Sequence, residues 1–257
     1  MVAATIDEVI FLLKRIIASE KDKNSSLAYF PVLYLRVTQR IKEGILANEF
    51  QDNSRMERLD VVFANRYLKA YEQFERGGQP SQSWLNCFKA KRLMVMQHLL
   101  LGINAHINLD LGIAAAEISE DDNNLPDLET DFNAINAILA SLVAEVKEKI
   151  GRISPLFKLL ELVGKGKEDK LVTFSINIAR DGAWLFANEY FNAVKKTSVV
   201  EPRDQKIAAL ATKIISPKSK LLQFMAKLVL FFEMKNTDKV VSILENKMAE
   251  ETFSFSD

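Results

Sequence analysis

The chain has 257 residues, and its 34 Lys and Arg are balanced by 34 Asp and Glu, so the formal net charge is zero. A protein that neutralises nucleic-acid phosphates usually carries a basic excess or a basic stripe; neither is evident, so we expect no nucleic-acid partner. The single cysteine, Cys87, excludes an intramolecular disulfide and a zinc cluster built from cysteines.

Helices account for almost the whole sequence. Apolar residues recur at three- and four-residue intervals, and the 9 glycines and 6 prolines fall at segment boundaries rather than at hairpin spacing. The predicted helices cover residues 5–20, 27–48, 54–76, 81–118, 127–150, 155–163, 169–196, 202–215, 219–234 and 237–250. We therefore predict an all-α fold, a bundle of about 8–10 helices in one domain over residues 1–250, with a tail over 251–257.

Helix start signals agree with these boundaries. Thr5 with Glu8, and Ser54 with Glu57, have the spacing of a capping box, in which the hydroxyl and the carboxylate satisfy exposed backbone amides. Pro202 falls at a predicted first helical position, where its missing amide hydrogen costs nothing.

The segment 81–118 carries an unusual number of polar groups for an apolar helix. On an ideal helix one stripe, with a four-residue step, contains His98, Gly102, His106 and Asp110. Asn104 and Asn108 lie on a different side of the helix, so we predict a central helix surrounded by others. Because the segment is long, we expect it to be broken near Gly102 or preceded by a short separate helix. Burying so many polar groups is costly unless they are paired, ligated or used, so a site is expected here.

His106 and Asp110 have the i, i+4 spacing that lets two side chains meet one metal ion, or each other. His98 lies about 12 Å along the axis from His106 on a straight helix, so it is assigned a catalytic or substrate-facing role instead. Asp60, in 54–76, and Asp181, in 169–196, each sit among apolar residues. If the three helices converge, these groups supply one nitrogen and several oxygens, a set that suits Zn, Mn, Fe or Mg.

The remaining candidate roles concern a substrate. Arg180 is assigned with His98 to catalysis, as a group that holds an anionic substrate. The candidate substrate-binding residues are Asn104, Asn108, Arg66 and Trp184.

Each candidate also has a structural interpretation. The His106–Asp110 pair is compatible with an ordinary buried hydrogen bond, and Asn104 and Asn108 with bonds to neighbouring helix ends. Trp184 fits a core position. Asp60 and Asp181 have candidate ion-pair partners in Arg36, Arg40, Arg66 and Arg180.

The string from Gln97 to Gly112, which contains N-A-H-I-N-L-D-L, resembles the signature of an uncharacterised, mainly bacterial, all-helical family of unknown function. The resemblance extends through Leu59–Tyr67 and Arg180–Trp184 and covers most of residues 30–195. The family brings no established activity, so the resemblance supports the choice of residues and leaves the chemistry open.

Two functional hypotheses follow. In the first, a divalent metal held by His106 and Asp110, with Asp60 and Asp181, activates water in a hydrolase. In the second, the protein does not catalyse a reaction, and the His–Asn–Asp cluster fixes helix packing or lines a pocket for a small molecule.

The location and assembly of the protein also follow from the sequence. The N-terminus lacks the basic region of a signal peptide, and the apolar runs are interrupted too often to span a bilayer. We therefore expect a cytoplasmic protein without membrane contact. The runs Leu221–Met225 and Leu228–Phe232 suit a homo-oligomer contact as well as a core, and we predict the core.

Overall fold

The computed structural model describes residues 1–120, 124–158 and 176–246, and every regular element within them is a helix. The elements are α1 (Ile6–Asp22), η1 (Ser26–Ala28), α2 (Tyr29–Leu46), α3 (Asn53–Glu75), α4 (Gln82–Lys89), α5 (Val95–Ala105), η2 (His106–Leu111), α6 (Gly112–Ser119), η3 (Pro126–Leu128), α7 (Glu129–Ile153), α10 (Ile176–Asn192), α11 (Thr197–Ile215), α12 (Lys220–Phe232) and α13 (Thr237–Glu245). The predicted all-α fold is confirmed.

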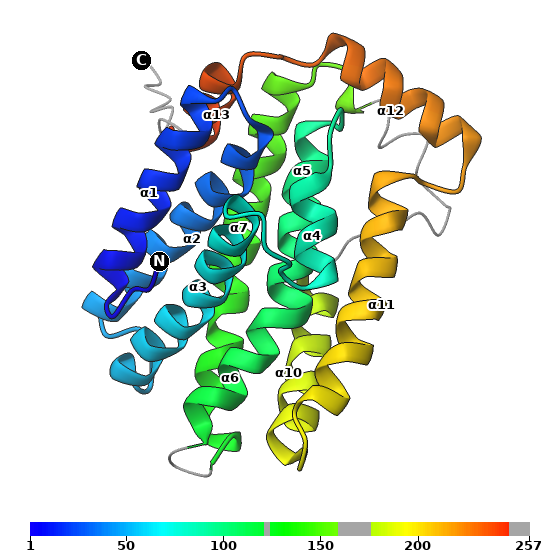
Figure 1. Ribbon diagram of the computed structural model, residues 1–257. Coiled ribbons are helices and arrows are strands. Elements are labelled where there is room, and N and C mark those ends of the chain that lie inside the picture. The colour runs from blue at the N-terminus through cyan, green and yellow to red at the C-terminus, as the bar shows by residue number, and fades with distance from the viewer. Residues whose placement is uncertain (121–123, 159–175, 247–257) are drawn as a thin grey trace, which may run out of the picture.

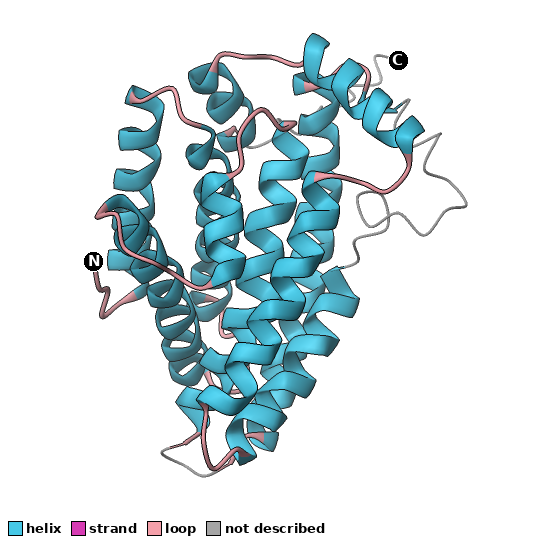
Figure 2. Cartoon of the chain, turned by 45° about the vertical axis from the view of Figure 1, so that its right-hand side comes forward, coloured by secondary structure: helices cyan, strands magenta, loops and turns pink. Residues whose placement is uncertain are grey.

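The continuous run of α5, η2 and α6 forms the centre of the bundle. It packs against α2, α3, α4, α7, α10 and α11, and the long helices lie side by side around it (Figures 1 and 2). Within the described chain, Val95–Ser119 is the one helical stretch that is long and apolar enough to cross a membrane, and 89% of its apolar window is buried. The prediction of a central helix is thus confirmed.

The segment 81–118 is not a single helix. α4 is a short separate helix, and the chain turns between Lys89 and Val95 before α5 begins, as one of the two alternatives predicted. The helix does not break at Gly102. Instead, the backbone widens into a π-helix, η2, at His106.

Helix starts agree only in part with the sequence signals. Thr5 caps α1, because its hydroxyl accepts from the Glu8 amide at 3.2 Å. The predicted cap at Ser54 is wrong, since Asp52 accepts from the Arg55 amide at 2.8 Å and takes that place. Pro202 lies inside α11, which begins at Thr197, so the predicted start of that helix is also wrong.

Several predictions fall partly or wholly outside the described residues. They concern most of helix 155–163, the first part of 169–196, the end of 237–250 and the tail over 251–257. The prediction that the apolar runs of α12 belong to the core is confirmed for Leu222 and Val229, which are buried. It is wrong for the side chains that remain exposed, namely Leu221, Phe224, Phe231 and Phe232.

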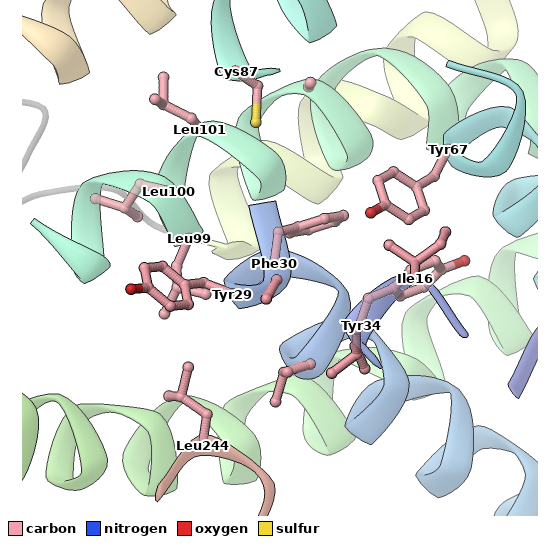
Figure 3. Packing of buried hydrophobic residues seen from close by; sticks show 14 of the residues in the cluster. Ile16, Tyr29, Phe30, Tyr34, Tyr67, Cys87, Leu99, Leu100, Leu101 and Leu244 are labelled. Carbon is pink, nitrogen blue, oxygen red and sulfur yellow. The ribbon is translucent and has the colours of Figure 1, made fainter. Parts of the chain in front are cut away.

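Gly102 lets α2 approach the central helix closely. A Cβ atom at this position would lie 2.3 Å from two ring carbons of Phe30. Phe30 lies between Tyr29, Tyr34 and Tyr67 in the main core (Figure 3). An aromatic side chain of α2 therefore fills the space that the missing Cβ of Gly102 leaves.

Gly102→Ala should destabilise the protein by about 2 kcal/mol or more, because the added methyl group displaces Phe30 in a close-packed interior. Gly151→Ala is the matched control, since nothing lies within 4 Å of its added methyl group. It should instead gain up to about 1 kcal/mol from helix propensity. Urea unfolding followed by circular dichroism measures both changes, and equal midpoints for the two variants would contradict the packing argument.

Candidate functional site

His106 begins the π-helix η2, in the middle of the buried central run. Short π-helical turns inside α-helices are rare and occur frequently at functional sites. The ring nitrogen Nδ1 lies 3.4 Å from Oδ2 of Asp110, one turn further on. The pair predicted from the i, i+4 spacing is therefore formed, at the long end of hydrogen-bond distance.

Asp110 accepts hydrogen bonds from other helices as well. The indole Nε1 of Trp84 in α4 donates to Oδ2 at 2.8 Å, and Nε of Arg66 in α3 donates to Oδ1 at 3.0 Å. Arg66 also reaches Glu117 in α6 at 3.5 Å. Because the side chain of Asp110 is only 4% exposed, its charge depends on these partners for compensation.

Aromatic rings surround the imidazole of His106. Their centroids lie 3.5 Å (Phe63), 4.5 Å (Tyr34), 5.7 Å (Phe30), 5.9 Å (Trp84) and 6.2 Å (Tyr67) from the imidazole centroid. Phe63 stacks on it with planes 6° apart. Burial lowers the pKa of His106, and the hydrogen bond to Asp110 only partly opposes this shift. The ring is therefore neutral at pH 7; when Nδ1 donates to Asp110, Nε2 is left as an acceptor.

The second ring nitrogen of His106 is one of several buried polar atoms that have no hydrogen-bond partner among the described residues. The atoms are Oη of Tyr34, Oγ1 of Thr38, both carboxylate oxygens of Asp60, and Nε2 of His106. Tyr34 and Thr38 lie one turn apart on α2, and Asp60 lies on α3 one turn before Phe63. Buried polar atoms are almost always paired, so this concentration on adjoining helix faces requires an explanation.

Electrostatics connect these groups. Burial raises the pKa of Tyr34 well above its ordinary value, and the negative charges of Asp60 and Asp110 raise it further. The neighbouring Thr38 hydroxyl lowers it, although no hydrogen bond of ordinary geometry joins the two. Tyr34 thus lies within the field of both carboxylates.

Asp60 is the most perturbed acid at this site. Burial raises its pKa to about 7, and the nearby Glu57 charge contributes in the same direction. The alternative of an ion pair between Asp60 and arginine is not seen among the described residues, because Arg36 binds Glu145 and Arg40 binds Glu49, while Arg66 is engaged by Asp110. Asp60 is therefore a largely protonated acid up to about neutral pH.

His98 occupies a separate position in the core. It packs edge-on against Tyr29 at 5.9 Å, and burial lowers its pKa to about 4. It is uncharged at pH 7. No hydrogen bond or ring contact among the described residues joins it to His106.

The candidates on α10 lie elsewhere. Arg180 donates to the carbonyl of Phe132 and to Asn136, with its guanidinium 4.4 Å from the Phe132 ring centroid. Trp184 packs on the same ring at 4.9 Å, and Asp181 is exposed. The structure thus assembles Arg180 and Trp184 around α7 and does not bring Asp181 to the buried cluster.

The two asparagines serve helix packing in this structure. Asn104 donates to the carbonyl of Ile207 in α11 at 3.1 Å and accepts from Asn108 at 3.1 Å. The carbonyl of Asn108 in turn accepts from Arg203 at 2.9 Å. These contacts agree with the structural interpretation, in which both asparagines bond to neighbouring helices.

The four predicted metal ligands are not gathered into one site. In the portions of the chain described above, no group of three or more His, Cys, Asp and Glu side chains could hold a metal ion. His106 and Asp110 lie together, while the Asp110 oxygens are already occupied by Trp84 and Arg66.

The family model described as a family of unknown function, DUF5995, matches residues 6–217. The chain belongs to this family. The matched residues include the whole buried cluster and end before α12. No curated protein and no solved structure matches the chain.

Sequence reasoning missed Tyr34, Thr38 and Trp84. The three- and four-residue spacing of Phe30, Tyr34, Thr38 and Ile41 was a signal, because it places both hydroxyls on the buried face of α2. No comparable signal existed for Trp84, since its partner Asp110 lies 26 residues away.

Asp60→Asn tests the environment of the buried acid through the pH dependence of stability. The folded pKa is raised from 3.8 to about 7, so the wild-type protein loses stability as pH rises from about 4 to 7, and the loss is complete above 7. The asparagine variant lacks this titration. Relative to wild type it should gain about 4 kcal/mol between pH 4 and pH 8, as measured by chemical unfolding at each pH. Parallel stability curves would show that Asp60 titrates normally.

Asp110→Asn should lower the free energy of unfolding by about 3 kcal/mol, because Arg66 and Trp84 lose a charged acceptor inside the core. Glu49→Gln is the matched control, since it removes the exposed ion pair with Arg40 and should cost less than about 1 kcal/mol. Urea unfolding at pH 7 compares the two variants. Similar small losses in both would mean that Asp110 does not organise the core.

Proposed function

We propose that the protein binds a small, neutral, polar molecule among Tyr34, Thr38, Asp60 and His106. The observation that supports this proposal is the set of five buried polar atoms without partners on these residues. Leaving a buried donor or acceptor unpaired costs about 1–3 kcal/mol, so a ligand that pairs several of them gains binding energy. These four residues are called the α2–α3 cluster below.

The protonation states define what fits the α2–α3 cluster. Protonated Asp60 offers a hydroxyl donor and a carbonyl acceptor, the hydroxyls of Tyr34 and Thr38 donate or accept, and Nε2 of His106 accepts. The charge of Asp110 is already compensated by Arg66. A ligand with both donors and acceptors and no net charge, such as an amide or a polyol, therefore matches this surface better than an ion.

Phe63 marks the route to the cluster. It is the one partly exposed ring of the five around His106, and the other four are buried. In this proposal a small molecule reaches the imidazole when the Phe63 side chain rotates, and such rotations are part of ordinary side-chain motion.

Acid–base catalysis on the bound molecule is the second candidate. Asp110 holds Nδ1 of His106 while Nε2 stays free, which is the arrangement of a general base. Asp60, with a pKa of about 7, adds an acid whose environment differs from that of Asp110. These two groups support a hydrolase or an isomerase that works without metal, whereas the metal-dependent hydrolase draws no support from the described residues.

The binding proposal is tested by NMR of protein labelled with 15N in histidine. The chain has two histidines, so the spectrum reports His106 and His98 separately. Acetamide, added as the probe, should shift the Nε2 signal of His106 in a saturable manner, because it donates to this acceptor. His98, which faces Tyr29, should not respond and serves as an internal control.

Asp60→Leu and Thr38→Val should each weaken the acetamide response at least several-fold, since each removes the hydrogen-bonding atoms of one side chain from the cluster. Asn86→Ala, at a half-buried position on α4 that bonds to the Ala208 carbonyl, is a matched control that should leave it unchanged. Equal shifts at both histidines, or a response that the cluster variants do not alter, would refute specific binding at this site.

A further inference from the structure

The helix α12 exposes an apolar face along its whole length. The exposed fractions of its outward side chains are 52% (Leu221), 63% (Phe224), 76% (Phe231) and 56% (Phe232). Contiguous exposed apolar patches mark interaction sites, whereas single exposed apolar residues are ordinary. Several large side chains on one short helix form such a patch.

This exposure does not reflect a detached helix. Leu222 and Val229 on the opposite face are buried in the main core. At the C-terminal end, Glu233 accepts from the Val95 amide at 3.0 Å, and the amide of Met234 donates to the carbonyl of Ile153 at 3.0 Å. The body of the protein therefore holds α12 in place with its aromatic side outward.

The exposed charges of α12 and of the residues that flank it, from 217 to 236, have one sign. Lys218, Lys220, Lys227 and Lys235 are all exposed. The only acid between residues 217 and 236 is Glu233, which is buried. On a helical projection Lys220 and Lys227 lie at the edge of the stripe formed by Phe224 and Phe231.

The position of α12 suits a flat partner. It lies across one end of the bundle, crosswise to the long helices, in both views (Figures 1 and 2). Its 13 residues extend about 20 Å, which is too short to span the roughly 30 Å hydrocarbon core of a bilayer. A helix of this kind, with aromatic and aliphatic side chains beside lysines, fits the interface of a membrane.

We propose that α12 docks the protein onto the surface of a membrane that carries anionic lipids. The aromatic side chains enter the headgroup region, and the lysines contact the acidic headgroups. A second copy of the chain is a poorer occupant, because a twofold contact through this face would bring two sets of lysines together, and residues 217–236 offer no exposed acid to pair them. The expectation of no membrane contact was based on the lack of a segment that could span a bilayer, and docking at the membrane surface does not require one.

The test is co-sedimentation with vesicles of phosphatidylcholine that contain roughly one-third phosphatidylserine, at about 100 mM salt. The full-length chain should bind these vesicles, bind pure phosphatidylcholine at least several-fold more weakly, and dissociate as salt increases. Phe224→Asp with Phe231→Asp should reduce binding at least tenfold. Lys220→Glu with Lys227→Glu should reduce binding and its dependence on salt.

Leu185→Asp is the matched control, because Leu185 is 71% exposed on α10, away from α12. It should bind as the wild type does, and thermal melting should show that all variants fold. Absence of binding to anionic vesicles, or equal binding by the wild type and the phenylalanine variant, would overturn the proposal. Sedimentation showing a dimer that depends on Phe224 and Phe231, without vesicle binding, would assign the face to a second copy.

Discussion

The buried carboxylate of Asp110 is the interaction on which the centre of this bundle depends. A charge inside an apolar core is tolerated only when several donors surround it, and three elements supply them here: Trp84 from α4, Arg66 from α3 and His106 from η2. The separate helix α4 serves this requirement, because it carries the indole that donates to the carboxylate. Because Asp110 contacts Nδ1 of His106, Nε2 is the ring nitrogen left without a partner in the described part of the chain.

Part of this arrangement was readable from the sequence, since it depends on local periodicity. The helical fold, the central segment and the pairing of His106 with Asp110 follow from spacings of three and four residues. The surroundings of Asp60 were not readable, because they depend on which helix faces meet after folding. The arginines considered as its partners are engaged elsewhere, and the Tyr34 hydroxyl of α2 lies within the field of its carboxylate instead.

Two helix starts were placed wrongly because more than one residue near each start favours that position. Asp52 caps α3 ahead of Ser54, and α11 begins at Thr197, so that Pro202 lies within its early turns. The core assignment of α12 was wrong for a different reason. Periodicity identifies an apolar stripe on a helix. Because α12 is apolar over most of its circumference, its sequence does not indicate which part of that surface packs against the core.

Asp60 lowers the free energy of unfolding, and packing alone does not explain its presence in the core. A buried acid without a hydrogen bond lowers stability above pH 4, and an apolar residue of similar size would avoid that loss. Departures from the rule that buried polar groups are paired occur chiefly at functional sites, where binding or catalysis compensates for the lost stability. The α2–α3 cluster lies wholly within the family match over residues 6–217, while α12 lies beyond it. The proposed ligand site and the proposed membrane-docking face therefore rest on separate parts of the chain, and each proposal stands or fails without the other.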